Sequence, residues 1–153
     1  MSTTLPKEAF IALAALSWAD GDLRASEKSG LISAARAAGV PEADLPAIER
    51  ALSERTPLES FAPGDMSDWQ RIVTYAIGCW LARLDGVVST DERDSLQQLA
   101  KRLDLKQPVC ERAGIAAFDV YVQPEGGRPD RFDFVRLELR LRERLPQQAA
   151  STG

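Results

Sequence analysis

The sequence predicts an all-α fold of about seven helices built as two related halves. The main observation is an internal repeat, in which residues 19–31 and 84–96 match at a constant offset of 65 positions. Each copy follows a strongly apolar run, contains an Asp-Gly pair and precedes an amphipathic run. A helix, a short loop and a second helix therefore occur twice. The other segments carry helical spacing or helix start and stop signals.

The first half opens with the apolar run 9–19. Pro6 suits the first turn of this helix, where its missing N–H costs nothing. The second helix contains the run 31–40 and ends at Gly39 and Pro41, which are typical stop residues. A third helix is predicted at the end of this half, on apolar residues at helical spacing: Leu45, Ile48 and Leu52.

The turn-rich segment 56–68 is expected to connect the two copies. The fourth helix then starts near Ser67 or Asp68, and the fifth starts near Ser89. Residues 107–118 predict a short sixth helix. We expect a helical domain over residues 1–123 and a C-terminal extension over residues 124–153, which packs on the domain or on a partner and frays after residue 146.

The last segment, 135–142, fits two structures. Its apolar and charged residues alternate as in a strand, which could pair with 117–122 as a β-hairpin. Its Leu, Arg and Glu residues are strong helix formers, and acids and a proline stand at the two ends of 132–145 as helix signals. We favour the helix, whose apolar residues cover more than one face and could leave area for a protein partner or a second copy. The predicted partner-binding residues are Leu137, Leu139, Leu141, Arg136 and Arg140.

Composition and charge exclude several classes of protein. The 153 residues are 44% apolar and 27% charged, as in an ordinary globular domain. A net charge of −4 argues against nucleic-acid binding. No apolar run is long enough for membrane insertion, and the N-terminus lacks signal-peptide features, so we expect a cytoplasmic protein.

The absence of histidine excludes Ser-His-Asp and Cys-His catalysis and zinc sites that use imidazole. No nucleophile or phosphate-binding loop accompanies the acidic residues, and we therefore expect no enzyme. Cys79 and Cys110 have no paired-ligand spacing and are expected to be buried apolar residues. The three tryptophans are expected in the core: Trp18, Trp69 and Trp80.

Each Asp-Gly segment resembles the second half of a calcium-binding loop. Asp20, Gly21 and Glu27 fall at the fifth, sixth and twelfth positions of an EF-hand loop, but Leu16 and Trp18 occupy the first and third positions, which require oxygen ligands. The second copy has the same deficiency. Neither segment is an EF-hand, yet each keeps two carboxylates around a glycine turn. The second set is Asp85, Gly86 and Glu92.

Helix capping is the alternative role for these acids. Asp-Gly is ordinary turn chemistry, and Ser89 with Glu92 forms a complete capping-box pattern. In the first copy Arg24 replaces the capping serine, so no matching box accounts for Glu27. This difference favours a functional role for Glu27, while the capping role stays open.

The two copies suggest a pseudo-two-fold arrangement with both loops at one end of the bundle. Four carboxylates there would repel one another unless neighbouring arginines and lysines or a cation intervene. A divalent cation is the predicted cofactor, with Ca²⁺ or Mg²⁺ favoured over Zn²⁺ and a dissociation constant on the order of 10⁻⁴ to 10⁻³ M. The predicted ligands are Asp20, Glu27, Asp85 and Glu92, with Gly21 and Gly86 forming the turns.

These repeated residues resemble the tellurite-resistance TerB-like family, whose helical domain also occurs in membrane-anchored DnaJ-type co-chaperones. The resemblance covers roughly residues 8–120 and rests on Asp20, Gly21, Glu27, Asp85, Gly86 and Glu92. It implies an all-helical bundle of two related halves, a bacterial stress-response context and divalent-metal binding by the acidic loop residues. The arginine-rich C-terminal segment does not map onto the family.

Two functions follow as expectations. The first is a non-enzymatic TerB-like protein of the bacterial stress response that binds a divalent metal weakly through its duplicated Asp-Gly loops. The alternative is a protein-interaction module that uses the C-terminal Leu/Arg-rich segment, with the acidic loops serving only as caps.

Overall fold

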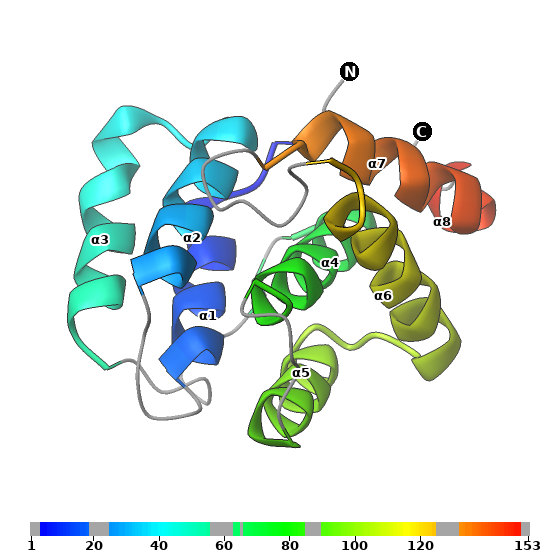
Figure 1. Ribbon diagram of the computed structural model, residues 1–153, viewed down its shortest axis with the longest axis horizontal. Helices are drawn as coiled ribbons and strands as arrows, with labels where there is room; N and C mark the ends of the chain where they lie inside the picture. Colours follow the sequence, from blue (N-terminus) through cyan, green and yellow to red (C-terminus); the bar gives the residue numbers. More distant parts are fainter. Residues whose placement is uncertain are drawn as a thin grey trace.

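The computed structural model describes residues 4–18, 25–55, 63–64, 66–84, 90–124 and 132–150, without the side chains of residues 26, 91 and 92. These ranges are helical and contain no strand (Figure 1), which confirms the all-α prediction. The elements are α1 (Lys7–Ser17), α2 (Ala25–Ala37), the short 3-10 helix η2 (Glu42–Asp44), α3 (Leu45–Ser53), α4 (Asp68–Ala82), α5 (Thr90–Arg102), α6 (Gln107–Tyr121), α7 (Phe134–Arg144) and α8 (Pro146–Ala150).

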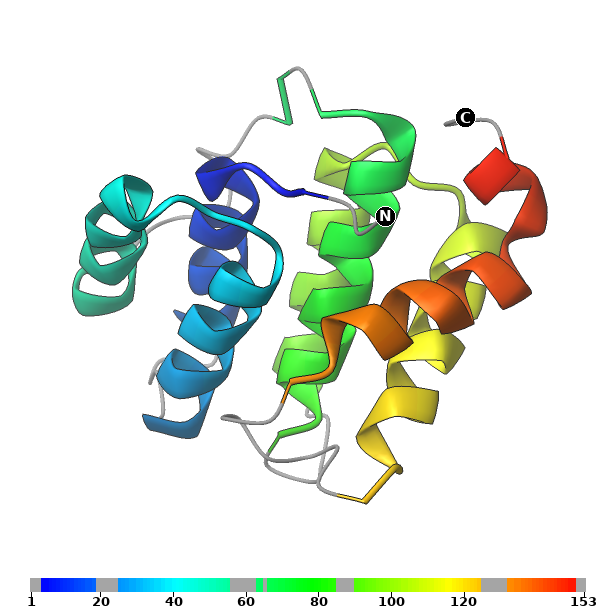
Figure 2. The same ribbon diagram turned by 90° about the horizontal axis from the view of Figure 1, so that it is seen from above.

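The helices form two groups that meet along α1, α2 and α4. Figures 1 and 2 show α1, α2 and α3 on one side and α4 with α5, α6 and α7 on the other. Within the first group α3 packs on α1, and within the second α6 packs on α4. Between the groups, α1 contacts α4 and α5, while α2 contacts α4. In the repeat, α1 corresponds to α4 and α2 corresponds to α5. The contact of α1 with α5 is therefore equivalent to the contact of α2 with α4, as a pseudo-two-fold arrangement requires.

The helix boundaries repeat at the offset seen in the sequence. Helices α2 and α5 begin at residues 25 and 90 and end at residues 37 and 102, a shift of 65 at both ends. Helices α1 and α4 end at residues 17 and 82, with the same shift. The shift continues into the next elements, since η2 begins at residue 42 and α6 at residue 107. The repeated unit therefore includes the third helix of each half, whereas the sequence repeat indicated only the first two.

The ends of α2 and α5 have the same backbone geometry. Gly39 and Asp104 are equivalent residues and both adopt positive φ, at 82° and 56°. Three residues beyond the end of each helix, the N–H of Val40 donates to Ala35 O at 3.1 Å and that of Leu105 to Ala100 O at 3.0 Å. This is the Schellman pattern, in which a left-handed residue satisfies the last free carbonyls of a helix.

The predicted starts of α4 and α7 are confirmed. Ser67 caps α4 in a full capping box, in which its hydroxyl accepts from Gln70 N and its own N–H donates to Gln70 Oε1. Asp133 caps α7 and accepts from Arg136 N at 2.9 Å. Pro6 lies one residue earlier than expected, at the N-cap of α1.

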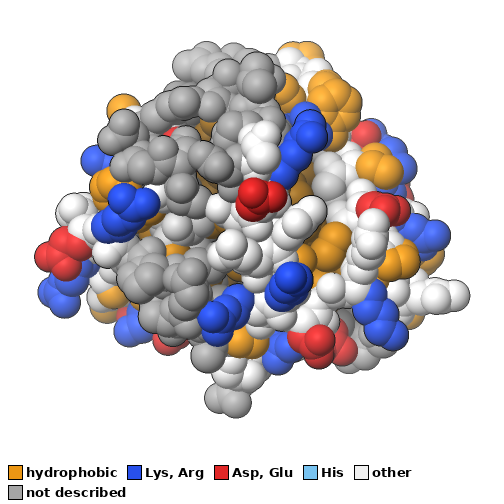
Figure 3. All heavy atoms as spheres, turned by 90° about the horizontal axis from the view of Figure 1, so that it is seen from below, with side chains coloured by type: hydrophobic (Ala, Val, Ile, Leu, Met, Phe, Trp, Pro, Cys, Tyr) orange, Lys and Arg blue, Asp and Glu red, His pale blue; other side chains and the backbone are white. Residues whose placement is uncertain are grey.

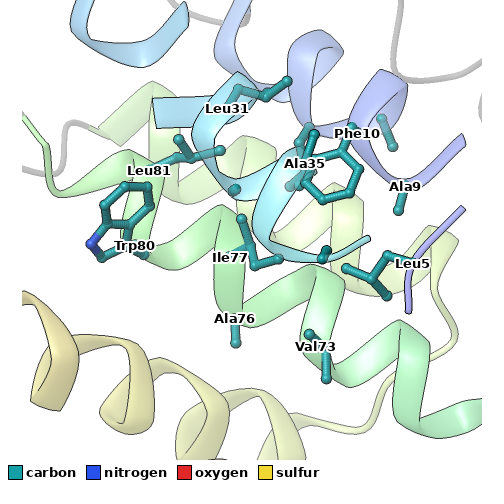
Figure 4. Packing of buried hydrophobic residues seen from close by; sticks show 14 of the residues in the cluster. Leu5, Ala9, Phe10, Leu31, Ala35, Val73, Ala76, Ile77, Trp80 and Leu81 are labelled. Carbon is teal, nitrogen blue, oxygen red and sulfur yellow. The ribbon is translucent and has the colours of Figure 1, made fainter. Parts of the chain in front are cut away.

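The core lies where the two groups of helices meet. Figure 4 shows Phe10 of α1 beside Ala35 of α2, with Ile77 and Leu81 of α4 directed toward the same space. Trp69 and Trp80 are only 3% and 0% exposed, as predicted. Trp18 is half-buried, and its indole N–H donates to Ala51 O at 3.0 Å.

The C-terminal segment is a helix, and the alternative hairpin is wrong because residues 117–121 lie in α6 and 135–142 lie in α7. The buried residues of α7 recur at helical spacing and pack against α4 and α6: Phe134, Leu137, Glu138 and Leu141. Residues 146–150, expected to fray, form α8, whose Ala149 packs on the core. None of the described helices combines the length and the apolar content that a membrane span requires.

Candidate functional site

The start of α2 packs against the end of α4, which brings the flanks of the two Asp-Gly segments together. A Cβ added at Gly30 of α2 would lie 2.9 Å from Leu84 Cδ1 and 3.3 Å from Leu81 Cδ2. Leu84 directly precedes Asp85 in the sequence, and Gly30 lies three residues after Glu27. The absence of a side chain at Gly30 therefore allows the close approach of the two repeats at this end.

Glu27 is the one predicted ligand whose side chain the structure describes, and it is only 9% exposed. It lies one helical turn before Gly30 and Leu31 on the buried face of α2, and it makes an interaction within the chain. Burial of a carboxylate is costly unless the group is paired, hydrogen-bonded or bound to a cation. The burial of Glu27 therefore requires such a group around it.

The other predicted ligands and turn residues lie outside the described residues: Asp20, Gly21, Asp85 and Gly86. Glu92 is in the first turn of α5, but its side chain is not described, and Ser89 of the expected capping box also lies outside. Among the described side chains, no group of three or more Asp, Glu, His or Cys residues is placed to hold a metal ion. The structure therefore places Glu27 at the junction and leaves the rest of the set as a prediction.

The end of α1, from which the first Asp-Gly segment leaves, is held by the end of α3. Besides the indole hydrogen bond of Trp18, the guanidinium of Arg55 donates to Trp18 O at 3.4 Å. Both contacts join α1 to residues at or after the last turn of α3. The third helix of the first half thus fixes the point at which the segment begins.

Comparison with models of known protein families, with curated proteins and with solved structures found no match. The resemblance to TerB-like proteins rests on the repeated Asp-Gly pattern alone.

The predicted partner surface on α7 is smaller than its sequence indicates. Leu137 and Leu141 are 0% exposed, so they belong to the core and are not available to a partner. Leu139 is 55% exposed, and Val135, one turn earlier, is 58% exposed. These two residues form the apolar part of the outer face of α7.

The arginines of α7 form ion pairs with acidic residues, so they do not give the helix an unbalanced positive surface. Arg136 pairs with Asp133 at 3.6 Å, and Arg140 pairs with Glu143 at 3.0 Å. The other pairs are Arg142 with the buried Glu138, and Arg144 with Asp119 of α6. On the face shown in Figure 3, basic and acidic side chains are likewise interspersed with small apolar patches.

A second polar feature was not anticipated from the sequence. Tyr75 and Cys110 line a surface groove of about 410 Å³ between α4, α5 and α6. Cys79 is buried as predicted, whereas Cys110 is only half-buried. The groove depends on the packing of α6 on α4, which no local sequence pattern shows.

Proposed function

We propose that this protein is a non-enzymatic, TerB-like helical protein that binds a divalent cation weakly where its two halves meet, in a stress-response role. The observation that carries the proposal is the burial of Glu27, one helical turn before Gly30, which lies against Leu81 and Leu84 at the end of α4. That position lies beside the residues that lead into the second Asp-Gly pair. Carboxylates gathered at such a junction are stabilised by a hard cation.

Four carboxylates around two glycine turns would supply oxygen ligands to Ca²⁺ or Mg²⁺, with water completing the coordination. The proposed ligands remain Asp20, Glu27, Asp85 and Glu92. With this few charged ligands we expect a dissociation constant of roughly 10⁻⁴ to 10⁻³ M. A cation that joins the two loops would also stabilise the fold, because it binds the folded chain and not the unfolded one.

The test is isothermal titration of EDTA-stripped protein with Ca²⁺, Mg²⁺, Mn²⁺ and Zn²⁺. A Glu27→Gln, Glu92→Gln double variant removes one proposed ligand from each copy and keeps side-chain volume. Glu49→Gln, an exposed change on α3, is the matched control. We expect heat from the wild type and from the control but none from the double variant. A wild type that takes up no divalent cation at millimolar concentration would refute the proposal and leave the acids as caps.

The exposed pair Val135 and Leu139 favours a second candidate function, a protein-interaction module that uses the outer face of α7. Deletion of α7 would be a poor test, because the helix also buries core residues. A Val135→Asp, Leu139→Asp double variant changes only exposed positions. If this face forms a dimer, light scattering of the wild type should show a concentration-dependent mass that the variant lacks. A monomeric wild type would rule out self-association.

A further inference from the structure

The outer face of α6 carries an exposed apolar stripe. Ile115 is 46% exposed, Phe118 is 42% exposed and Val122 is 55% exposed. With 3.6 residues per helical turn, these three side chains fall within an arc of about 60° around the helix axis. The buried residues of α6 lie on the opposite face: Ala113, Ala116, Ala117 and Val120. Figures 1 and 2 show α6 at the edge of the molecule, so this stripe is open to a partner.

Opposite charges lie on the two sides of Ile115 along this stripe. The guanidinium of Arg83, at the C-cap of α4, lies over the Phe118 ring with its Cζ atom 4.7 Å from the ring centroid. Glu111 lies one turn before Ile115 on the same face and accepts a hydrogen bond from Gln107 at 3.2 Å. Within the described ranges, neither Arg83 nor Glu111 takes part in an ion pair. Each charge is therefore available to a partner.

We propose that this face binds a second copy of the chain, in an antiparallel contact of α6 with α6 whose two-fold axis passes beside Ile115. A helix rises about 1.5 Å per residue, so Glu111 lies about 6 Å to one side of Ile115 and Phe118 about 4.5 Å to the other. A two-fold axis reverses this order in the second copy. Glu111 of each copy then lies opposite Phe118 and Arg83 of the other, and the contact contains two equivalent ion pairs.

The same axis also matches the apolar residues. Ile115 meets Ile115 of the second copy, because a residue beside a two-fold axis contacts its own equivalent. Val122, seven residues after Ile115, meets Pro108, which lies seven residues before it and is exposed. A parallel pairing of the two helices would instead place Arg83 beside Arg83 and Glu111 beside Glu111, which is unfavourable. Charge complementarity therefore selects the antiparallel arrangement.

This contact is independent of both proposed functions. Its residues belong to α6 and to the end of α4, whereas Glu27 lies on α2, and Val135 and Leu139 lie on the outer face of α7. Small interfaces give weak complexes, so we expect monomer and dimer to exchange at micromolar to millimolar concentrations.

The experiment is sedimentation equilibrium of the full chain in EDTA, which removes any effect of cations at the Asp-Gly segments. We expect the mass of the wild type to rise with concentration from one chain toward two. Arg83→Glu and Glu111→Arg should each raise the dissociation constant roughly tenfold or more, because each change places like charges together at two points. The variant with both changes recreates both ion pairs in reversed order, and its dissociation constant should return to within roughly threefold of the wild type.

Cysteine crosslinking tests the position of the axis. In a Cys110→Ser background, Ile115→Cys places two thiols beside the axis, and mild oxidation with diamide should link the two chains. Val122→Cys in the same background is the matched control, because this position lies about 10 Å from the axis along the helix and should not crosslink. This result keeps the proposal testable even where a charge variant does not fold, which circular dichroism would reveal.

The Val135→Asp, Leu139→Asp variant should dimerise as the wild type does, which separates this contact from the outer face of α7. Four results would each overturn the proposal. They are a wild type that is monomeric at millimolar concentration, folded charge variants that dimerise as the wild type does, a folded double charge variant that stays as weak as the single ones, and equal crosslinking of Ile115→Cys and Val122→Cys. Loss of the dimer in the α7 variant would likewise overturn it.

Discussion

Gly78 in α4 allows a close contact between three helices, and its replacement by alanine gives a sharp test of the packing. A Cβ at this position would lie 3.2 Å from Leu13 Cδ2, 3.2 Å from Leu16 Cδ2 and 3.3 Å from Leu99 Cδ2. These leucines belong to α1 and α5 and are themselves buried, so they have little room to move. Gly114 in α6 is the matched control, because a Cβ there would meet nothing within 4 Å.

Two opposing effects set the expected magnitude. Alanine is better than glycine inside a helix by about 1 kcal/mol. An extra methyl in a filled core costs about 1–3 kcal/mol. We therefore expect Gly78→Ala to lower the free energy of unfolding by about 1 kcal/mol and Gly114→Ala to raise it by about 1 kcal/mol. The two variants should differ by about 2 kcal/mol although they make the same chemical change.

Urea unfolding and thermal melting followed by circular dichroism measure this difference. For a chain of this size, 1 kcal/mol corresponds to roughly 2–4 °C in Tm. The Tm of Gly114→Ala should rise by about that amount and the Tm of Gly78→Ala should fall by a similar amount. If Gly78→Ala is stabilised as much as Gly114→Ala, then α1 and α5 do not pack against α4 as closely as described.

Three further changes test other parts of the fold by denaturant unfolding. Leu141→Ala should cost about 2–5 kcal/mol because Leu141 is fully buried, whereas Leu139→Ala should stay within about 0.5 kcal/mol; equal losses would contradict the orientation of α7. Asp104→Gly should stabilise the chain by up to about 1 kcal/mol because it relieves a positive φ, and a loss would argue against that backbone. Burial raises the pKa of Cys79 to about 12, so the folded chain favours the protonated thiol. The contribution of this thiol to the free energy of unfolding is therefore complete below pH 9 and falls as the pH rises from 9 toward 12. Cys79→Ala should therefore show a shallower loss of stability above pH 9 than the wild type, and an unchanged slope would refute this.

The internal repeat can be detected in the sequence mainly at the turns, because the backbone conformation of a turn restricts which residue types can occupy it. Asp-Gly pairs recur for this reason, and the stop after α2 is visible as Gly39. The equivalent stop after α5 is not visible, because Asp104 takes the same left-handed conformation without being glycine. Because aspartate replaces glycine at this left-handed position, the end of α5 cannot be recognised in the sequence as the end of α2 can.

The sequence predicts a third helix in each half, but side-chain size hides the equivalence of these two helices. The equivalent buried positions are Ile48, Ala51 and Leu52 in α3, and Ala113, Ala116 and Ala117 in α6. Small residues let two helices approach closely, so α6 lies against α4 on alanines where α3 uses larger side chains against α1. Side chains of different size thus occupy equivalent positions in the same backbone arrangement. Alignment of the two half-sequences therefore does not detect the equivalence of α3 and α6.

Two features of the candidate sites depend on tertiary contacts that no local pattern contains. Strict alternation in α7 suggested a strand, but helical spacing assigns Leu137 and Leu141 to the core and Leu139 to the surface. The groove lined by Tyr75 and Cys110 arises only when α6 packs on α4. Glu27 is different, since the absence of a capping partner in the sequence already singles out this residue.

The contact between α1 and α4 explains where the two halves have diverged. Leu13 and Gly78 are equivalent positions, 65 residues apart, and each is a direct neighbour of the other across the two helices. In a two-fold arrangement, a residue that contacts its own equivalent lies next to the axis. Two leucines at that point would hold the helices apart, so the close contact needs a small residue in one copy. The halves therefore differ in residue size at this contact, while the Asp-Gly pairs, which begin several residues beyond it, keep the same sequence in both copies.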